Sequence, residues 1–350
     1  MIVINGKEIA NYSTPYIIAE IGANHNGDME LAKKIIDKAV ECGVDAVKFQ
    51  SWTNKSLISR SEYEKNQRYD DSPKKHFGSL EEMVEKYYLR REQHFLLKEY
   101  CDQKGVQFCS TPFSNEEVDL LEELEVPFYK VASMDINNYR LLKYIGEKGK
   151  PVILSTGMST IAEIDNAVKV IEKTGNKKII ILHCVSLYPP EPEDIHLNNI
   201  LLLQKMYPNY PIGFSDHTIG TSVPIASVAL GAAVIEKHFT LDKDLPGWDH
   251  EISANPEEMK YIVEESKIVS KALGNYHRTV TEAEEEKKLK FRRSIVVTRD
   301  MRKGEVIEES DITFKRPGTH ISPDQMQYVI GRKLNRDLSE DDLLDWDYLE

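Results

Sequence analysis

Short apolar runs rich in β-branched residues recur along the first two thirds of the chain. They occupy residues 16–22, 46–50, 106–113, 127–133, 151–157, 179–186, 211–218 and 232–239. Amphipathic segments lie between them, and in one of these Val118, Leu121 and Leu124 recur at helical spacing among acidic residues. Strands that are apolar on both faces and alternate with helices predict a parallel sheet.

Eight strand–helix units over about 220 residues predict a closed (β/α)8 TIM barrel. An open, doubly wound sheet is the structural alternative. We expect the barrel domain to span residues 1–274, followed by a charged linker or solvated helix at 275–290. Short strands and turn signals in residues 291–350 predict a separate, small β-rich domain.

One interval in this series is much longer than the others. The second predicted strand ends at Gln50, and the third begins near Val106. The start of this insert, residues 51–82, is polar and aromatic without a strong period. Long loops in compact domains are usually functional, so we expect this one to cover the barrel mouth as a lid.

Composition narrows the classes of function. The chain of 350 residues has a net charge of −13 and no basic cluster, which argues against nucleic-acid binding. It contains no apolar run of about 20 residues, and its N-terminus has neither the basic nor the apolar region of a secretory signal. The four cysteines are isolated in the sequence, which is typical of reduced packing residues in a cytoplasmic protein.

Polar and charged side chains gather where the predicted strands end, whereas the strand starts are apolar. They are Glu20, Lys48, Gln50, Ser110, Thr111, Lys130, Ser133, Asp135, Ser155, Thr156, His183, Ser186, Ser215, Asp216, His217, Glu236, Lys237 and His238. Each alone would be a buried polar group paired with a neighbour. Their presence on all eight strands predicts an active site at the C-terminal mouth of the barrel.

The residue types at these ends indicate the ligands. Two lysines and several hydroxyls suit a small phosphorylated or carboxylated anion. An isolated His217 would more often be a hydrogen-bonded core residue. However, it ends the strand next to that of His238, so the two imidazoles can converge on a divalent cation such as Mn²⁺. The absence of an HExxH helix and of a cysteine-rich site disfavours a structural zinc.

Several motifs, all at strand ends, resemble one family. They are IIAEIGANHNGD (17–28), AVKFQ, STPF, YKVAS, LSTGM, LHCVSLYPP, GFSDHT and VIEKHFTLDKDLPGWDH, with KRPGTHISP at 315–323. The chain resembles, over nearly its whole length, the NeuB-type sialic acid (N-acetylneuraminate) synthases with a C-terminal SAF, or antifreeze-like, domain. The resemblance implies condensation of phosphoenolpyruvate with an N-acylated hexosamine, which yields a nonulosonic acid and phosphate.

The resemblance also implies roles for particular residues. Lys48, Thr111, Lys130, Ser133, Ser155 and Ser215 match residues that hold phosphoenolpyruvate, and His217 and His238 match metal ligands. Glu20, Gln50, Tyr188 and Asp249 match residues that contact the open-chain sugar or a metal-bound water, with Glu20 as the base. Arg316 matches an arginine that reaches the partner subunit's barrel. The family thus implies a divalent metal, with Mn²⁺ favoured over Mg²⁺ or Co²⁺, and a homodimer with exchanged small domains.

A few positions depart from the family pattern. Asp135 and Ser186, both expected near the substrate, are shorter than the Glu and Asn common there, and Trp248 can reshape the pocket beside Asp249. His320 replaces a frequent Gly, and we have no account of it. These departures leave N-acetylmannosamine and 2,4-diacetamido sugars, the precursors of legionaminic and pseudaminic acid, both open as substrates.

Two further functions remain as alternatives. A phosphoenolpyruvate-condensing synthase that acts on a phosphorylated sugar should need a second phosphate site, but no surplus cationic cluster occurs at the strand ends. A non-catalytic carbohydrate- or ice-binding protein would not need the ionisable groups at the barrel mouth.

Overall fold

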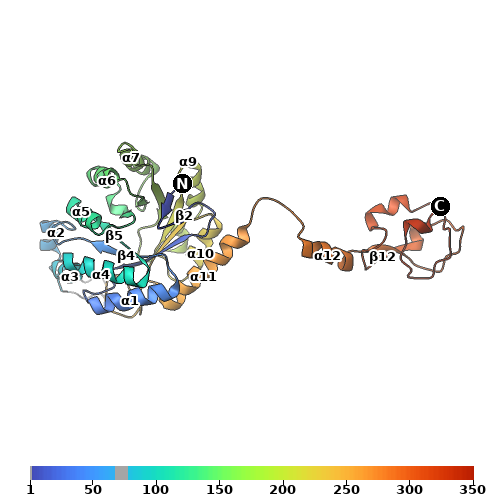
Figure 1. Cartoon of the computed structure of the whole chain (residues 1–350), viewed down its shortest axis with the longest axis horizontal. Helices are drawn as coiled ribbons and strands as arrows, with labels where there is room; N and C mark the ends of the chain where they lie inside the picture. The colour runs from blue at the N-terminus through green and yellow to red at the C-terminus, as the bar shows by residue number, and fades with distance from the viewer. Residues whose placement is uncertain (1, 68–77) are drawn as a thin grey trace. The chain divides into compact units, whose positions relative to one another are not determined.

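The computed structural model describes residues 2–67 and 78–350 (Figure 1). Its internal contacts divide the chain into two compact units, Met1–Gly274 and Asn275–Glu350. All four cysteines are free and buried. None of the described helices is long and apolar enough to cross a lipid bilayer.

The first unit contains a sheet of eight parallel strands. They are β3 (Tyr16–Gly22), β4 (Ala46–Ser51), β5 (Gln107–Pro112), β6 (Tyr129–Val131), β7 (Val152–Ser155), β8 (Ile179–Cys184), β9 (Ile212–Asp216) and β10 (Val234–His238). Their order is β5-β4-β3-β10-β9-β8-β7-β6, and the outermost strands β5 and β6 are in contact. The first and last strands of the series, β3 and β10, pair in parallel. This pairing confirms the predicted (β/α)8 barrel and excludes the open sheet.

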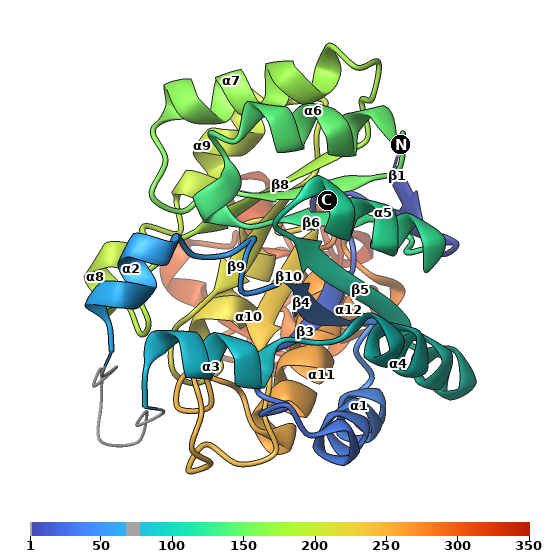
Figure 2. The ribbon, with the colours of Figure 1, turned by 90° about the vertical axis from the view of Figure 1, so that its left-hand side faces the viewer.

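Helices surround the strands, as Figure 2 shows. They are α1 (Met29–Cys42), α4 (Arg91–Lys104), α5 (Asn115–Glu123), α6 (Tyr139–Glu147), α7 (Ile161–Glu172), α8 (Pro192–Ile195), α9 (Asn199–Met206), α10 (Ser222–Ala229) and α11 (Pro256–Leu273). Local sequence signals mark their ends. The Asp28 side chain accepts hydrogen bonds from the first backbone N–H groups of α1, and Gly43 ends this helix in the left-handed region with φ 80°.

Side-chain alternation along the strands creates two apolar layers. Ile17 and Ala19 of β3 belong to the large core between the strands and the helices. Tyr16 and Ile18 instead belong to a smaller core, together with Phe128 and Val234. Because successive strand residues point to opposite faces, this smaller core fills the interior of the barrel.

An N-terminal β-hairpin, which the sequence analysis did not predict, completes the interior core. Its strands β1 (Ile2–Ile4) and β2 (Lys7–Ile9) pair in an antiparallel manner. Asn5 and Gly6, with φ values of 45° and 78°, form the tight turn between them. Ile2, Ile4 and Ile9 pack against the inner residues near the strand starts. The apolar interior therefore lies toward the N-terminal end of the barrel, which leaves the other end to polar residues.

The insert between β4 and β5 contains α2 (Arg60–Lys65) and α3 (Leu80–Tyr87). Trp52, Tyr63 and Met83 are buried together in a small core of this insert. The predicted lid, residues 51–82, includes 68–77, which lie outside the described residues.

The second unit has a core of its own. Strands β11 (Ser294–Val297) and β12 (Ile312–Lys315) pair in an antiparallel manner, and Ile295, Val297 and Ile307 are among the buried residues. Short 3₁₀ helices occur at Glu309–Asp311, Pro323–Tyr328 and Trp346–Tyr348. The preceding helix α12 (Glu282–Phe291) carries no buried residue. Most of the charged segment 275–290 is thus a solvated helix.

Candidate active site

A cavity of about 410 Å³ opens where the barrel strands end. This volume lies in the range of small-molecule sites. The predicted site residues that line it are Glu20, Lys48, Gln50, Thr111, Lys130, Ser133, Ser155, Ser186, Tyr188, Ser215, His217, His238 and Asp249. The structure therefore brings residues from all eight strand ends together around one space.

One predicted site residue of the barrel, Asp135, does not line this cavity, and Arg316 belongs to the other compact unit. Asp135 lies in the 3₁₀ turn Ser133–Asp135 after β6, where its carboxylate accepts a hydrogen bond of 3.0 Å from Asn138. Arg316 belongs to the second unit, where its guanidinium stacks on the ring of Phe291 at 4.9 Å. Asp135 is thus hydrogen-bonded within its own loop, whereas the role implied for Arg316 concerns a partner subunit and stays a prediction.

Two lysines and two glutamates form a buried charge cluster at the bottom of the cavity. Lys48 Nζ lies 2.7 Å from Glu20 and 3.9 Å from Glu236, and Lys130 Nζ lies 3.4 Å from Glu236. Gln50 donates a 2.8 Å hydrogen bond to the other oxygen of Glu20. All four charged side chains are less than a tenth exposed. Buried charges are tolerated only when paired, and these pair with one another across four strands.

The two carboxyl groups differ in proton affinity. Burial raises the pKa of Glu20 to about 7, against the lowering effect of Lys48 and with a further rise from Glu236. The pKa of Glu236 is lowered, because Lys130 and Lys48 together outweigh the effect of burial. Near neutral pH the site therefore contains one ionised carboxylate and one group able to gain or lose a proton.

Hydroxyl groups surround this cluster. Thr111 accepts a hydrogen bond of 3.1 Å from Lys48, and Ser215 donates one of 3.0 Å to Glu236. The buried hydroxyl of Ser155 has no partner among the described residues. A buried polar group without a partner costs free energy, so this hydroxyl is available to a ligand.

Gly157, directly after β7, allows two of the lining loops to approach each other. A Cβ atom at this position would lie 2.2 Å from Ser186 Oγ and 2.8 Å from Ser133 Oγ. Its backbone N–H donates a 3.0 Å hydrogen bond to Ser133 Oγ. The glycine of the LSTGM motif thus holds Ser133 and Ser186 close together at the cavity wall.

His217 and His238 lie side by side, with ring centroids 5.4 Å apart. His217 Nδ1 donates to the Val185 carbonyl at 2.8 Å, so Nε2 carries the lone pair. Burial lowers the pKa of His217, but Cys184 and Val185 raise it overall. Burial, with further contributions from His217 and Lys48, holds the pKa of His238 well below its usual value. Nδ1 of this neutral imidazole is buried, has no hydrogen-bond partner among the described residues, and lies 3.6 Å from an Asp249 oxygen.

These donors fit a divalent cation that keeps several water or substrate ligands. Two imidazole nitrogens and a nearby carboxylate suit Mn²⁺ and related ions. Within residues 2–67 and 78–350, no group of three or more His, Cys, Asp or Glu side chains forms a metal cage. The ring of Tyr188 lies 4.1 Å from that of His217 and 6.0 Å from that of His238, and it covers both imidazoles.

Part of the cavity wall is apolar. Trp52 and Leu57 come from the insert, Phe113 follows β5, and Trp248 lies in the loop after β10. The Trp52 ring meets those of Phe113 and Trp248 edge to face, each at 6.1 Å. Met134 and Met158 also line the cavity. Apart from Trp248, these residues are not predicted from the sequence, because an apolar residue beyond a strand end carries no distinctive signal.

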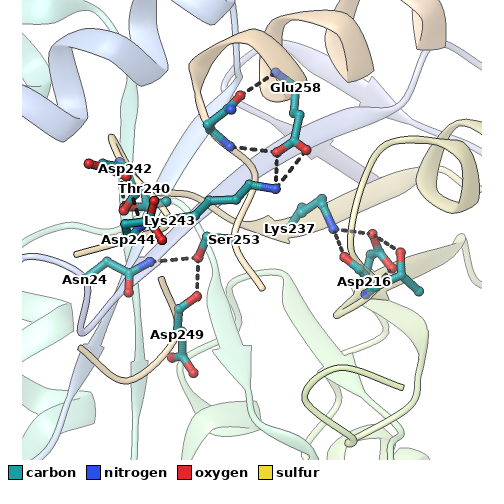
Figure 3. A network of polar contacts seen from close by, with 12 residues as sticks. Asn24, Asp216, Lys237, Thr240, Asp242, Lys243, Asp244, Asp249, Ser253 and Glu258 are labelled. Carbon is teal, nitrogen blue, oxygen red and sulfur yellow. Dashed lines mark hydrogen bonds and ion pairs between the residues drawn. The ribbon is translucent and has the colours of Figure 1, made fainter. Parts of the chain in front are cut away.

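Some strand-end residues that we expected at the mouth face the other side of the barrel wall. Lys237 and Asp216 pair with each other (Figure 3), and His183 hydrogen-bonds the Ile195 carbonyl. They occupy outward positions because alternate strand residues point to opposite faces. Glu236, two residues before His238, faces inward. It belongs to the predicted ring of strand-end residues, but the family resemblance assigns it no role in the site.

Comparisons with known proteins identify the family. Residues 35–278 match the NeuB family, and residues 292–350 match the SAF domain. The chain is 44% identical to the uncharacterized protein MJ1065 of Methanocaldococcus jannaschii, over 99% of this chain and 98% of that protein. It is 38% identical to the N,N'-diacetyllegionaminic acid synthase of Legionella pneumophila, over 99% of this chain and 98% of that enzyme.

A solved structure supports the same assignment. The N-acetylneuraminic acid synthetase of Leptospira borgpetersenii, crystallised with citrate, is 35% identical and superimposes with a TM-score of 0.73. The match covers 82% of this chain and 94% of that one. The chain therefore belongs to the NeuB family, carries a C-terminal SAF domain, and is a C–C bond-forming transferase of the sialic acid synthase type.

Proposed function

We propose that this NeuB-family enzyme condenses phosphoenolpyruvate with an unphosphorylated, N-acylated hexosamine, which yields a nonulosonic acid and phosphate. We further propose that the reaction depends on a divalent metal, with Mn²⁺ favoured. One observation carries this proposal. A single cavity is lined by two different sets of side chains. Lys48 and Lys130, with the nearby hydroxyls and two imidazoles, form what we call the cationic pole, and Trp52, Phe113 and Trp248 form the aromatic pole.

The cationic pole suits the phosphate and carboxylate of phosphoenolpyruvate. Lys48 and Lys130 supply two positive charges, and the pKa of Glu236 keeps one compensating negative charge. When Glu20 is protonated, the cluster has a net positive charge, which favours an anion. The unpartnered hydroxyl of Ser155 and the hydroxyl of Ser215 are placed to donate hydrogen bonds to it.

The imidazoles of His217 and His238 would hold the metal ion, with Asp249 and Tyr188 beside them. A divalent ion held there would supply Lewis-acid polarisation of the aldehyde group of the open-chain sugar. Carbon C3 of phosphoenolpyruvate attacks the sugar C1, so that the C2=C3 π bond is replaced by the new C–C bond, and protonated Glu20 gives its proton to the aldehyde oxygen, which becomes a hydroxyl group. Water then adds at C2 while the Glu20 carboxylate takes its proton, and the C2–O bond to phosphate breaks as the new C2 hydroxyl loses its proton to the phosphate and becomes a carbonyl group. Lys48 and Lys130 stabilise the departing dianion.

The aromatic pole suits the far end of an unphosphorylated sugar. Trp52, Phe113 and Trp248 present ring surfaces that pack against methyl and C–H groups. Among the described residues that line the cavity, the only cations are Lys48 and Lys130, which belong to the cluster at its bottom. A second phosphate on the sugar would thus meet an apolar wall, and this disfavours the phosphorylated-sugar alternative.

We also propose a homodimer in which each SAF domain covers the partner's barrel mouth. Met134, Met158, Leu187 and Ile219 expose apolar side chains in the loops that follow β6, β7, β8 and β9. Such an apolar rim is typical of a surface that another protein covers. Arg316 is the SAF-domain residue proposed to reach the sugar, so Arg316→Ala should raise KM for the sugar more than KM for phosphoenolpyruvate. A monomeric mass in light scattering would refute this part.

Phosphate release tests the proposed reaction directly. The enzyme is incubated with phosphoenolpyruvate and N-acetylmannosamine, and in parallel with 2,4-diacetamido-trideoxyhexoses, with Mn²⁺ and then with a chelator. We expect metal-dependent release with at least one of these sugars, and the ratio of kcat/KM values identifies the substrate. Absence of release with every hexosamine would refute the synthase proposal, and undiminished release with chelator would refute the metal dependence.

A further inference from the structure

A fully buried ion pair lies on the outer face of the barrel wall, directly behind the two histidines. Lys237 Nζ is 2.7 Å from Asp216 Oδ2, and the two side chains are 1% and 0% exposed. Figure 3 shows the pair on neighbouring strands, with the lysine pointing at the aspartate. The catalytic scheme proposed above uses neither residue.

The register of the sheet connects this pair to the metal-binding candidates. Asp216 and Lys237 are directly paired residues of β9 and β10. Each immediately precedes a histidine, His217 and His238 respectively. Since successive residues of a strand point to opposite faces, the outward ion pair and the inward imidazoles share the same short segments of backbone.

The pair also fixes the backbone on the far side of His217. Asp216 accepts hydrogen bonds from the Thr218 backbone N–H at 3.0 Å and from the Thr218 hydroxyl at 3.1 Å. Lys237 Nζ donates to the Thr218 carbonyl at 2.5 Å. The residues before and after His217 are therefore both tied to β10 by one lysine, and this leaves the histidine little freedom to move relative to His238.

Stability alone does not account for this arrangement. Removing two charges from water costs several kcal/mol per ion, and replacement of a buried ion pair by apolar side chains of similar volume is often neutral or stabilising. The surrounding outer core is built from residues such as Ile212, Phe214 and Ile235, so an apolar pair would pack there. Apolar side chains, however, cannot form the directional hydrogen bonds that hold the ends of β9 and β10 in a single geometry.

We infer that Asp216 and Lys237 are positioning residues that set the separation and orientation of the His217 and His238 imidazoles. The inference rests on the proposed function, since it concerns the proposed metal site. A pair of imidazoles binds an ion tightly only if both lone pairs converge on one point, and groups that orient metal ligands typically change affinity by about 10- to 100-fold.

The test replaces the pair and measures metal binding, folding and turnover separately. The double variant Asp216→Leu, Lys237→Met keeps the volume and removes both charges. We expect its unfolding midpoint to stay close to that of the wild type, whereas its Mn²⁺ affinity, measured by isothermal titration calorimetry, falls about tenfold or more. KM for phosphoenolpyruvate should change much less than kcat, because the lysines proposed to bind it lie on β4 and β6.

Single variants keep the test decisive if the double variant does not fold. Lys237→Arg retains a donor for Asp216 and Thr218 and should bind Mn²⁺ nearly as well as the wild type. Lys237→Met should bind it less tightly. A purely structural role would instead lower stability in both variants and leave the Mn²⁺ affinity of the folded fraction unchanged, and that result would overturn the inference.

The ion pair of Lys7 and Asp45 provides a matched control at the other end of the barrel. Its atoms are 2.8 Å apart, and Asp45 also accepts a hydrogen bond from the Ile17 backbone N–H, near the start of β3. Lys7→Met should lower stability without changing Mn²⁺ affinity. If it weakens metal binding as much as Lys237→Met does, the inference fails. If the wild type itself binds no Mn²⁺, the metal part of the proposed function fails instead.

Discussion

The substitution Glu20→Gln tests whether burial controls the proton of the proposed base. The Glu20 carboxyl is 1% exposed and lies beside both Lys48 and Glu236. Glutamine has nearly the same shape as a protonated glutamic acid, but it cannot ionise. The variant therefore removes the titration of one group and leaves the packing of the cavity nearly intact.

The difference in free energy of unfolding between the wild type and Glu20→Gln should depend on pH. The reason is that burial raises the pKa of Glu20 to about 7 from its ordinary value of 4.5. A carboxyl with a raised pKa in the folded state contributes its full stability below pH 4.5. That contribution is lost as the pH rises through 7. The shift corresponds to about 3 kcal/mol in the free energy of unfolding. Relative to Glu20→Gln, the wild type should therefore become less stable by about this amount between pH 4.5 and pH 8.

Denaturant unfolding of both proteins at a series of pH values measures the difference. We expect the difference in unfolding free energy between the wild type and Glu20→Gln to change across pH 4.5–7 and to be constant above that window. Glu264→Gln, on an exposed part of α11, serves as the control for the loss of one negative charge. If the difference between the wild type and Glu20→Gln does not vary between pH 4.5 and pH 8, the argument that burial raises the pKa of Glu20 is refuted. Full turnover by Glu20→Gln would separately refute its role as the base.

Three further predictions concern different parts of the barrel. His217→Ala should reduce Mn²⁺-dependent turnover by more than about a hundredfold while its circular dichroism and unfolding midpoint stay near those of the wild type; retained activity would refute its role as a metal ligand. Trp248→Ala should raise KM for the sugar by about tenfold and leave KM for phosphoenolpyruvate nearly unchanged, because the ring belongs to the apolar wall; equal changes in both constants would contradict that placement. Phe128→Ala should lower the free energy of unfolding by about 3–5 kcal/mol, since this ring is fully buried in the barrel interior, whereas the activity of the folded fraction should persist; a loss below 1 kcal/mol would contradict it.

Apolar runs were sufficient to locate every strand of the barrel, because strands buried on both faces leave a continuous signal. The N-terminal hairpin that precedes these strands is not predicted from its apolar pattern, and the reason is physical. Its strands have only three residues each, too few for a clear period. The turn dipeptide Asn5-Gly6 was nevertheless visible in the sequence, and in the structure both residues adopt positive φ. An Asn-Gly dipeptide between two short apolar runs is therefore a usable signal for this hairpin.

The orientation of side chains at the strand ends was predicted less well than their position. We treated Lys237 and His238 as members of one ring, although adjacent strand residues must point to opposite faces. The same rule, applied from the apolar interior residue Val234, would have placed Glu236 and His238 inside and Lys237 outside. The direction of the Asp135 side chain cannot be predicted from strand alternation, because this residue follows a strand of three residues and lies in a 3₁₀ turn.

This contrast explains why the proposed chemistry could be derived from the sequence and the choice of sugar could not. Lys48, Lys130 and the two histidines occupy inward strand positions or directly follow one, so the geometry of the barrel determines where they point. The wall that would contact the sugar comes instead from loops, where Trp52 and Trp248 pack edge to face against each other. Loop conformations depend on their own packing rather than on a repeating register, and they vary more readily than strands do. The structure of this chain therefore places the proposed chemistry on the strands and the proposed sugar contacts on the loops.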